Sequence, residues 1–481
     1  MRNPAPSGLA SIFSMNSSPL TPSAPRFRGP VLAGTLIAAT LCGCTMMPAY
    51  QRPSAPVSAQ FPGLAVTNES RAADIAWGNF FAEERLKSLI NLALSNNLDL
   101  RVAVLNVEES RAEYRITRSA SFPAVEGSGS YARSHAAGLD TREWNASLGT
   151  TAWELDLFGR VRSLNRQALE KYFATAEARR SEQVALIAQV ATEYLTLRET
   201  EELLALSRQT LQAVRESYTL NKATFDAGAS SELDLRESES QVQTAQINVT
   251  TYERQQAEAR NYLTLLIGCP LPADLPPPRA FSGTNLVADI PAGLPSELLE
   301  RRPDILEAEH TLLAANADIG AARAAFFPTV TLTASVGTQS AQLSRLFGAG
   351  TGVWSFAPQV TAPLFTGGQN LANLEAAKVT KRIEVADYQH AIETAFREVS
   401  DALVDVVSYV QQIDEQAALV STQQRRYELA NLRYRQGDDT YLNALAAQQD
   451  LFTAQQSLIQ SQFNKVASQI SLYKAVGGGW Q

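Results

Sequence analysis

The chain has 481 residues, of which 45% are apolar and 19% charged, and its net charge is −8 at pH 7. This composition excludes a disordered chain and a multi-span helical membrane protein, and it provides no basic face for nucleic acid. The three cysteines and three histidines are too few and too widely spaced for a disulfide framework or a metal site. We therefore expect neither a metal nor a nucleic-acid partner.

An apolar run of eleven residues, 31–41, follows a segment that contains three arginines and no acid. Because a transmembrane helix needs about 20 residues, this run is typical of the core of a signal peptide. Met1 and Met15 are both candidate start residues, and Met15 gives a leader of more usual length.

The run ends at Leu41-Cys42-Gly43-Cys44, which resembles the bacterial lipobox. That resemblance implies cleavage before Cys44, a diacylglycerol on its thiol and an acyl chain on its amine. The alternative is an ordinary secretory signal with two incidental cysteines. Thr45 favours the outer membrane, since an Asp at this position is the usual signal for retention in the inner membrane.

The rest of the sequence repeats once, at an offset of about 205 to 209 residues. Residues 121–125 (SFPAV) correspond to 326–330 (FFPTV), and 266–268 (LIG) correspond to 475–477 (AVG). A proline-rich stretch between the halves reads as a linker. Each repeat is therefore expected to be one structural unit.

Each repeat combines a strand hairpin with long helices. Alternation of apolar and polar residues predicts strands near 125–131 and 144–150 and, more clearly, near 329–336 and 354–364. Apolar residues at steps of three and four predict helices that pair as left-handed coiled coils. The expected helices are 85–119, 160–225, 231–266, 295–325, 369–436 and 440–475.

The strand lengths suit tilted strands that cross a bilayer. Four strands cannot close a barrel, and an open sheet edge in lipid leaves backbone groups without hydrogen bonds. The sequence therefore predicts an oligomer, and a trimer with twelve strands is favoured over a narrower dimer with eight. The alternative is a coiled-coil scaffold, not a channel, in which the hairpins are only caps.

The stretch ELLERRPDILEAEHTLLAANADIGAARAAFFPTVTLTAS (297–335) and PLFTGGQ (363–369) resemble the outer-membrane factor family. These are the TolC-like, NodT-type outer-membrane efflux lipoproteins of tripartite resistance-nodulation-division systems. The resemblance implies a mostly α fold with a β-barrel portion, in which duplicated β-hairpin/long-helix units associate as a homotrimer. The trimer forms a 12-stranded transmembrane β-barrel that continues as a periplasmic α-helical coiled-coil tunnel.

The resemblance also implies an equatorial band around the tunnel, formed by the N-terminal, linker and C-terminal segments. With this band included, the domain boundaries can be placed. They are 1–43 (signal peptide), 44–84 (tether and equatorial segment), 85–269 (first repeat), 270–294 (linker), 295–477 (second repeat) and 478–481 (C-terminal tail).

The resemblance also implies function: passive conduction of small molecules, without catalysis and without a cofactor other than the lipid at Cys44. The implied partners are a periplasmic adaptor protein, an inner-membrane pump and outer-membrane lipid. The implied location is the outer membrane of a Gram-negative bacterium, with a lipid anchor and a large periplasmic portion. A type I protein-secretion channel is the alternative with the same architecture.

Two turns between helices are the candidate working region. Gly228 and Gly437 suit the left-handed residue that ends a helix, while Ser231 and Thr440 suit the N-cap of the next helix. In the family such turns contact the adaptor protein and close the channel.

Acidic side chains ring the closed aperture in the family. Asp439 is the best match to this ring and Asp438 is adjacent, while Tyr434 and Arg435 are candidates for the hydrogen bonds that hold the gate shut. The alternative is that both acids only cap the turn.

Arg301-Arg302-Pro303-Asp304 is the most specific part of the resemblance. Pro303 suits the first turn of a helix, and Asp304 complements the positive end of the helix dipole. We expect a structural role, with the arginines paired to acids.

Overall fold

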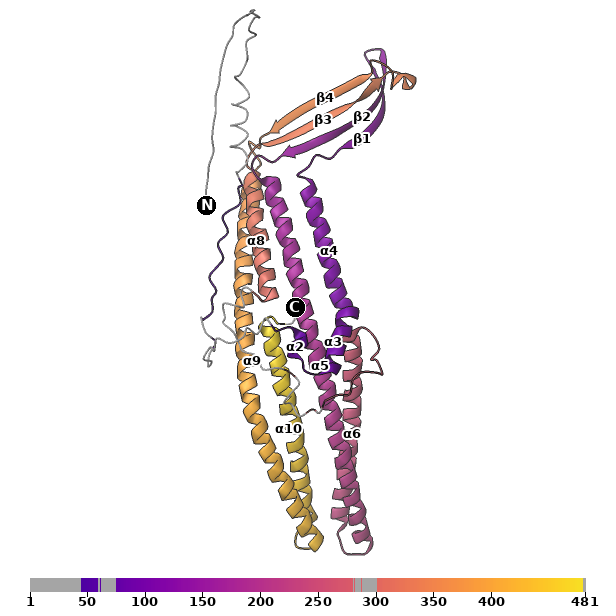
Figure 1. The fold of residues 1–481 in the computed structure, drawn as a ribbon, viewed down its shortest axis with the longest axis vertical. Coiled ribbons are helices and arrows are strands. Elements are labelled where there is room, and N and C mark those ends of the chain that lie inside the picture. Colours follow the sequence, from indigo (N-terminus) through magenta and orange to yellow (C-terminus); the bar gives the residue numbers. More distant parts are fainter. Residues whose placement is uncertain are drawn as a thin grey trace, which may run out of the picture. The chain divides into compact units, whose positions relative to one another are not determined.

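The computed structural model describes residues 45–58, 61, 75–279, 281, 287 and 301–478, all of which belong to one compact unit. The predicted signal peptide and the candidate lipidation residue Cys44 lie outside these described residues. Two long helical hairpins and one shared β-sheet make up the unit (Figure 1).

The helices follow the duplication. The α-helices are α2 (Trp77–Phe80), α3 (Glu84–Asn96), α4 (Leu98–Ser119), α5 (Arg160–Asp226), α6 (Glu232–Ile267), α8 (Pro303–Ala324), α9 (Gln369–Gln436) and α10 (Tyr441–Ala475). A short 3-10 helix, η2 (Leu343–Arg345), lies between α8 and α9. The predicted ranges of α5, α6, α9 and α10 are confirmed to within one residue at each end. No helix within the described ranges is both long enough and apolar enough to cross a membrane.

The helix predicted at 85–119 is wrong in one respect, because the chain breaks it at Asn97. Asn97 is extended and serves as the N-cap of α4, where its Oδ1 accepts a hydrogen bond from the Leu100 amide at 2.8 Å. Its Nδ2 donates to the Leu266 carbonyl at 2.9 Å. An Asn side chain competes with helical hydrogen bonds in this way, so one residue splits α3 from α4 and attaches the break to α6.

The duplication is visible in the backbone. Three pairs of glycines, each with positive φ, recur at the same spacing in the two halves: Gly159 and Gly368, Gly228 and Gly437, Gly268 and Gly477. They lie before each long helix, at each helical turn and after each second helix. The two halves therefore share their helix ends as well as their helix lengths.

The sheet joins the two repeats. Its strands β1 (Glu126–Ala136), β2 (Leu139–Leu155), β3 (Thr329–Ser340) and β4 (Gly352–Thr361) are antiparallel and lie in the order β1-β2-β3-β4. The pairing of β2 with β3 connects the halves, and β1 and β4 are left as open edges within this unit.

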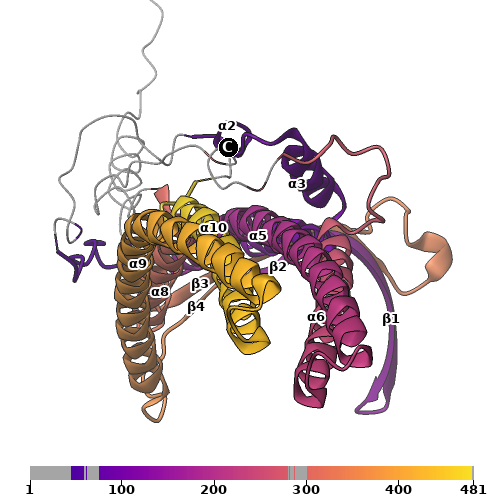
Figure 2. The same ribbon diagram turned by 90° about the horizontal axis from the view of Figure 1, so that it is seen from below.

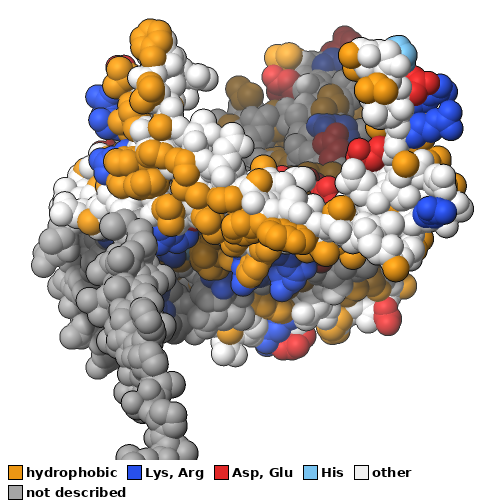
Figure 3. Space-filling model, turned by 90° about the horizontal axis from the view of Figure 1, so that it is seen from above, with side chains coloured by type: hydrophobic (Ala, Val, Ile, Leu, Met, Phe, Trp, Pro, Cys, Tyr) orange, Lys and Arg blue, Asp and Glu red, His pale blue; other side chains and the backbone are white. Residues whose placement is uncertain are grey.

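The two faces of the sheet differ in polarity, as the alternation predicted. Val336 lies opposite Trp354 and Ala334 opposite Phe356 on one face, and Trp354 is 78% exposed. The other face carries serine pairs that are hydrogen-bonded across strands: Ser128 with Ser147 at 2.9 Å, and Ser335 with Ser355 at 2.8 Å. Apolar side chains are also prominent in the view from above (Figure 3).

Two aromatic residues lie against each other on the apolar face of the sheet. The ring centroids of Tyr131 and Trp144 are 4.4 Å apart, and these residues are cross-strand partners in β1 and β2. Such a pair stabilises the hairpin register.

Arg302 connects three helices near the middle of the unit. Its guanidinium is buried and bonds Asp304 at 2.8 Å, Glu398 of α9 at 2.5 Å and the Ala475 carbonyl of α10 at 2.9 Å. Pro303 and Asp304 begin α8. The Arg-Arg-Pro-Asp motif thus holds the start of α8 against α9 and the end of α10, while Arg301 lies just before it.

We predict that Arg302→Ala lowers the thermal unfolding midpoint by several degrees. Breaking a buried ion pair costs about 3 kcal/mol or more, because it leaves the partner carboxylates and a carbonyl without a donor. Arg254→Ala is the matched control, since Arg254 bonds Glu258 at 2.7 Å in an exposed pair that is worth about 0.3–0.5 kcal/mol. Equal midpoints for the two variants, measured by circular dichroism in detergent, would refute the role of Arg302.

Candidate functional site at the helical turns

The two turns lie at the ends of the helices that point away from the sheet (Figure 1). Gly228 has φ +73° after α5, and Gly437 has φ +81° after α9. At Gly437 the amides of residues 437 and 438 return to the carbonyls of Tyr434 and Arg433. This arrangement satisfies the last carbonyls of the helix, and a residue with a Cβ adopts it with strain.

The helices that leave the turns start differently. Ser231 caps α6 in a reciprocal capping box with Asp234: its Oγ accepts from the Asp234 amide at 3.1 Å, and the Asp234 carboxylate accepts from the Ser231 amide at 3.3 Å. Thr440 lies at the N-cap position of α10 but makes no capping hydrogen bond with its side chain. The predicted N-cap position of Thr440 is therefore confirmed, although its hydroxyl does not supply the cap.

Asp439 holds the start of α10 instead. Its Oδ1 accepts from the Thr440 amide at 2.8 Å and from Asn443 Nδ2 at 2.6 Å, and Arg433 lies 3.5 Å away. The Asn443 bond first, and then the Thr440 amide, hold the pKa of Asp439 below its ordinary value. Asp438 is exposed, so the two acids differ: one is bonded into the turn and the other faces solvent.

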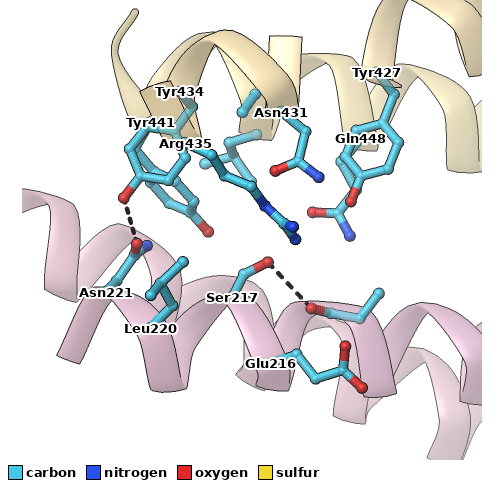
Figure 4. A pocket seen from close by; sticks show the side chains of 13 residues that line it. Glu216, Ser217, Leu220, Asn221, Tyr427, Asn431, Tyr434, Arg435, Tyr441 and Gln448 are labelled. Carbon is cyan, nitrogen blue, oxygen red and sulfur yellow. Dashed lines mark hydrogen bonds between the residues drawn. The ribbon is translucent and has the colours of Figure 1, made fainter. Parts of the chain in front are cut away.

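A hydrogen bond close to the turns connects the α5–α6 pair of helices to the α9–α10 pair. Tyr434 of α9 donates from its hydroxyl to Oδ1 of Asn221 on α5, at 2.5 Å (Figure 4). Asn221 is 1% exposed. Burial raises the pKa of Tyr441 to about 12, and a side-chain hydrogen bond with Asn221 opposes this rise, so all of these groups are neutral at pH 7.

Arg435 lies in the same groove between α9 and α5 (Figure 4). It forms no hydrogen bond or ion pair with any residue in the described part of the chain. Burial raises the pKa of nearby Tyr427, and the charge of Arg435 opposes that rise. Tyr434 and Arg435 are thus close to each other, but only Tyr434 bonds the opposite pair.

As far as Gln456 the contact between the pairs stays polar, whereas beyond it Val466, Ile470 and Tyr473 of α10 join the apolar cluster of α5 and α6. Gln449 of α10 donates to Gln241 of α6 at 3.0 Å, and Gln456 donates to the Tyr252 hydroxyl at 2.7 Å. Within the α5–α6 pair, by contrast, the core is aliphatic: Leu204, Leu211, Val214, Ala245 and Val249. Hydrogen bonds exchange readily with water, whereas apolar burial does not. Near the turns, the boundary between the pairs is therefore easier to open than the α5–α6 pair.

Asn221 did not emerge from sequence reasoning, although a signal was present. The apolar seam of α5 runs through Leu211, Val214 and Tyr218 in steps of three and four, and the next two positions are Asn221 and Phe225. A single Asn in a coiled-coil seam commonly specifies pairing at a cost in stability. The seam pattern could therefore have identified this residue.

A second region of interest is an extended strap, residues 45–58, which runs along α8 and α9. Arg52 bonds both carboxylate oxygens of buried Glu309, at 2.8 and 2.6 Å, and the Tyr50 hydroxyl donates to Glu309 at 3.1 Å. Burial, followed by the charge of Glu309, raises the pKa of Tyr50 well above its ordinary value. This cluster fixes the middle of the strap to α8.

The start of the strap reaches the sheet end of α8. Asn316 donates to the Pro48 carbonyl at 2.9 Å, and Arg323 to the Met46 carbonyl at 3.3 Å. A Cβ at Gly320 would lie 2.5 Å from the Met47 side chain, so a glycine is needed for this close passage. Thr45 is thereby held near the point where α8 gives way to β3.

Comparisons with known proteins agree with this architecture. The family model described as outer membrane efflux protein matches residues 89–269 and 294–478. The toluene efflux pump outer membrane protein TtgC of Pseudomonas putida is 45% identical over 94% of this chain and 96% of its own. The outer membrane protein OprJ of Pseudomonas aeruginosa is 40% identical over 93% and 96%. The open state of the Neisseria gonorrhoeae MtrE outer membrane channel superimposes with a TM-score of 0.85 at 38% identity, covering 91% of this chain and 99% of that one.

We predict that Tyr434→Phe makes the closed state leakier. The substitution keeps the ring, whose centroid is 5.3 Å from that of Tyr441, but removes a hydrogen bond worth about 1 kcal/mol and leaves the buried Asn221 oxygen without a donor. Tyr427→Phe is the control, since Tyr427 lines the same groove and no hydrogen bond of its hydroxyl occurs in the described part of the chain. A higher single-channel conductance in planar bilayers is expected for Tyr434→Phe alone. Identical traces for both variants would exclude the bond from gating.

Proposed function

Because the chain belongs to the outer membrane efflux protein family, we propose that it is the outer-membrane channel of a tripartite efflux pump and conducts small toxic molecules passively to the exterior. The observation that carries this proposal is the sheet, which has one apolar face, one polar face and two open edges. It continues into helical pairs whose mutual contact near the turns is polar. The name of the TtgC relative favours small molecules over a secreted protein as cargo.

We propose that the channel is a homotrimer. The open edges β1 and β4 need partners in lipid, where no water can satisfy the backbone. Three copies supply twelve strands, with the exposed residues Val336, Trp354 and Phe356 facing lipid and the serine face lining the interior. The exposed aliphatic residues of α9, among them Val404 and Val407, support contact with a neighbouring copy.

The helical turns are the proposed docking and gating end. Gly228, Ser231, Gly437 and Thr440 shape the two turns and are proposed to contact a periplasmic adaptor protein, which links the channel to an inner-membrane pump. Opening then requires the α9–α10 pair to part from α5–α6, which breaks the bond between Tyr434 and Asn221. The polar boundary between the pairs supports this movement as the one of lowest cost.

We further propose that Asp438 and Asp439 contribute carboxylates to the aperture. The exposed Asp438 is free to face a passing cation, and the lowered pKa of Asp439 keeps it ionised well below neutral pH. Three copies of each acid would favour cations at the closed end. Arg435, also exposed, limits this preference by its opposite charge.

The strap supports a lipid anchor at Cys44. It holds Thr45, the residue after Cys44, beside the sheet end of α8. Acyl chains at Cys44 would then meet the bilayer that surrounds the sheet. We propose a diacylglycerol on the thiol and an acyl chain on the amine, with cleavage of residues 1–43.

Purification of the protein in detergent, followed by conductance measurements, tests both the proposed channel and the proposed aperture carboxylates. We expect a trimer by light scattering that conducts in planar bilayers and prefers cations. Asp439→Ala should reduce that preference, because three carboxylates are lost. Glu428→Gln is the control, since Glu428 is an exposed acid on α9 bonded to Arg425 at 3.0 Å. A monomer without conductance would overturn the channel, whereas unchanged selectivity in Asp439→Ala would remove only Asp439 from the aperture.

A Cys44→Ser variant tests the anchor. We expect it to lose the mass of the acyl chains in mass spectrometry but still to form trimers when exported behind a cleavable secretory signal, because the sheet itself holds the protein in the bilayer. Glu309→Gln with intact Cys44 is the companion variant, which should keep the lipid but loosen the strap and raise its protease sensitivity. An unmodified Cys44 in the wild-type protein would refute lipidation.

A further inference from the structure

A hollow of about 560 Å³, open on one side, lies where α5, α6 and α10 meet. Glu193 and Glu199 line it from α5, and Tyr252 and Tyr262 line it from α6. Its size is within the range of small-molecule sites. It belongs neither to the turns nor to the groove that contains Tyr434.

The hollow opens on the concave side of the helical pairs. On α5, Tyr194 and Leu197 pack into the apolar cluster that includes α3, whereas Glu199 and Leu203 line the hollow. With 3.6 residues per turn these two sets lie on opposite faces of the helix. Figure 2 shows α3 on the outer side of the arc formed by α9, α10, α5 and α6. In the proposed channel, the hollow is therefore part of the inner wall.

Glu199 differs from every other buried glutamate in the described part of the chain. The other four have a hydrogen-bond or ion-pair partner: Glu83 with Tyr194, Glu170 with Arg166, Glu177 with Arg180 and Glu309 with Arg52. Glu199 is 7% exposed, has no such partner, and its Oε1 is fully buried. A buried carboxylate without a partner is unstable and requires either a proton or a cation.

The surroundings of Glu199 favour a cation. No lysine or arginine lines the hollow, and the α10 wall contributes Gln460 and no titratable group. Glu258 on the α6 wall is already bonded by Arg254 at 2.7 Å. Burial raises the pKa of Glu199 to about 7 and raises the pKa of Glu193, so the carboxyl of Glu199 exchanges its proton near neutral pH.

The chemistry selects an organic cation over a metal ion. No group of three or more histidine, cysteine, aspartate or glutamate side chains among the described residues could hold a metal. Leu203 and the two tyrosine rings offer apolar and aromatic surface, and aromatic faces attract ammonium groups. Glu199 lies close enough to Tyr252 for its charge to add to the rise that burial causes in the pKa of that tyrosine.

We infer that this hollow binds organic ammonium ions with an apolar body, with the ammonium group at Glu199 and the body against Tyr252 and Tyr262. The inference deepens the proposed function, because it places a binding station for amphiphilic amines on the inner wall. Binding replaces the proton of Glu199 by the ammonium ion, and the proton is released to solvent.

Isothermal titration of the detergent-purified full-length protein with benzylammonium tests the site, with benzyl alcohol as the neutral match. At pH 8 we expect saturable binding of benzylammonium and at least tenfold weaker binding of benzyl alcohol. Glu199→Gln should weaken benzylammonium binding at least tenfold. Glu253→Gln should leave it unchanged, since Glu253 lies on α6 outside the lining and pairs with Arg208 at 2.8 Å.

A second measurement needs no variant. Because only the ionised carboxylate binds, the affinity for benzylammonium should fall about tenfold between pH 8 and pH 6 for a group with a pKa near 7. Proton uptake or release on binding should appear as a dependence of the measured binding enthalpy on the ionisation enthalpy of the buffer. Affinity that is independent of pH, or equal in Glu199→Gln and wild type, would overturn the site. A protein that conducts but does not bind refutes only this site, and one that binds without conducting refutes only the channel.

Discussion

A strand at the edge of a sheet carries backbone amides and carbonyls without partners, and lipid offers none. The four strands of this chain have an apolar face and two open edges, so their location in the outer membrane is possible only if other strands complete the sheet. The rest of the architecture is consistent with that constraint. The two repeats meet through β2 and β3, which leaves one edge from each repeat available for a neighbour.

The helical part follows a different rule. Near the turns, aliphatic side chains hold α5 to α6, while amides, hydroxyls and a buried Asn connect one pair to the other. Polar contacts of this kind specify one closed arrangement without making it very stable.

The sequence predicted much of this fold because the signals were local. The 3.5-residue seam and the paired glycines located α5, α6, α9 and α10, and alternation located β3 and β4. The break at Asn97 escaped because it depends on the Leu266 carbonyl, far away in sequence.

The predicted working residues were less complete, for the same reason. Asp439 bonds to its own turn, and the partner of Tyr434 lies on the other repeat. Glu199 had no distinguishing pattern, since the lack of a partner is a property of packing. The sequence of the strap has no periodicity, and its path depends on contacts with distant residues such as Glu309, which lies more than 250 positions away.

Insertions within the strap and insertions ahead of it are expected to have different structural consequences. Arg52 is clamped by Glu309, and the backbone at Met46 and Pro48 is held by α8. Residues inserted between these contacts would have to bulge out, because both ends are held. Residues inserted ahead of Thr45 would leave these contacts unchanged. The strap therefore fixes the height of Thr45 along α8, and a spectroscopic label attached at this residue would report its distance from the sheet.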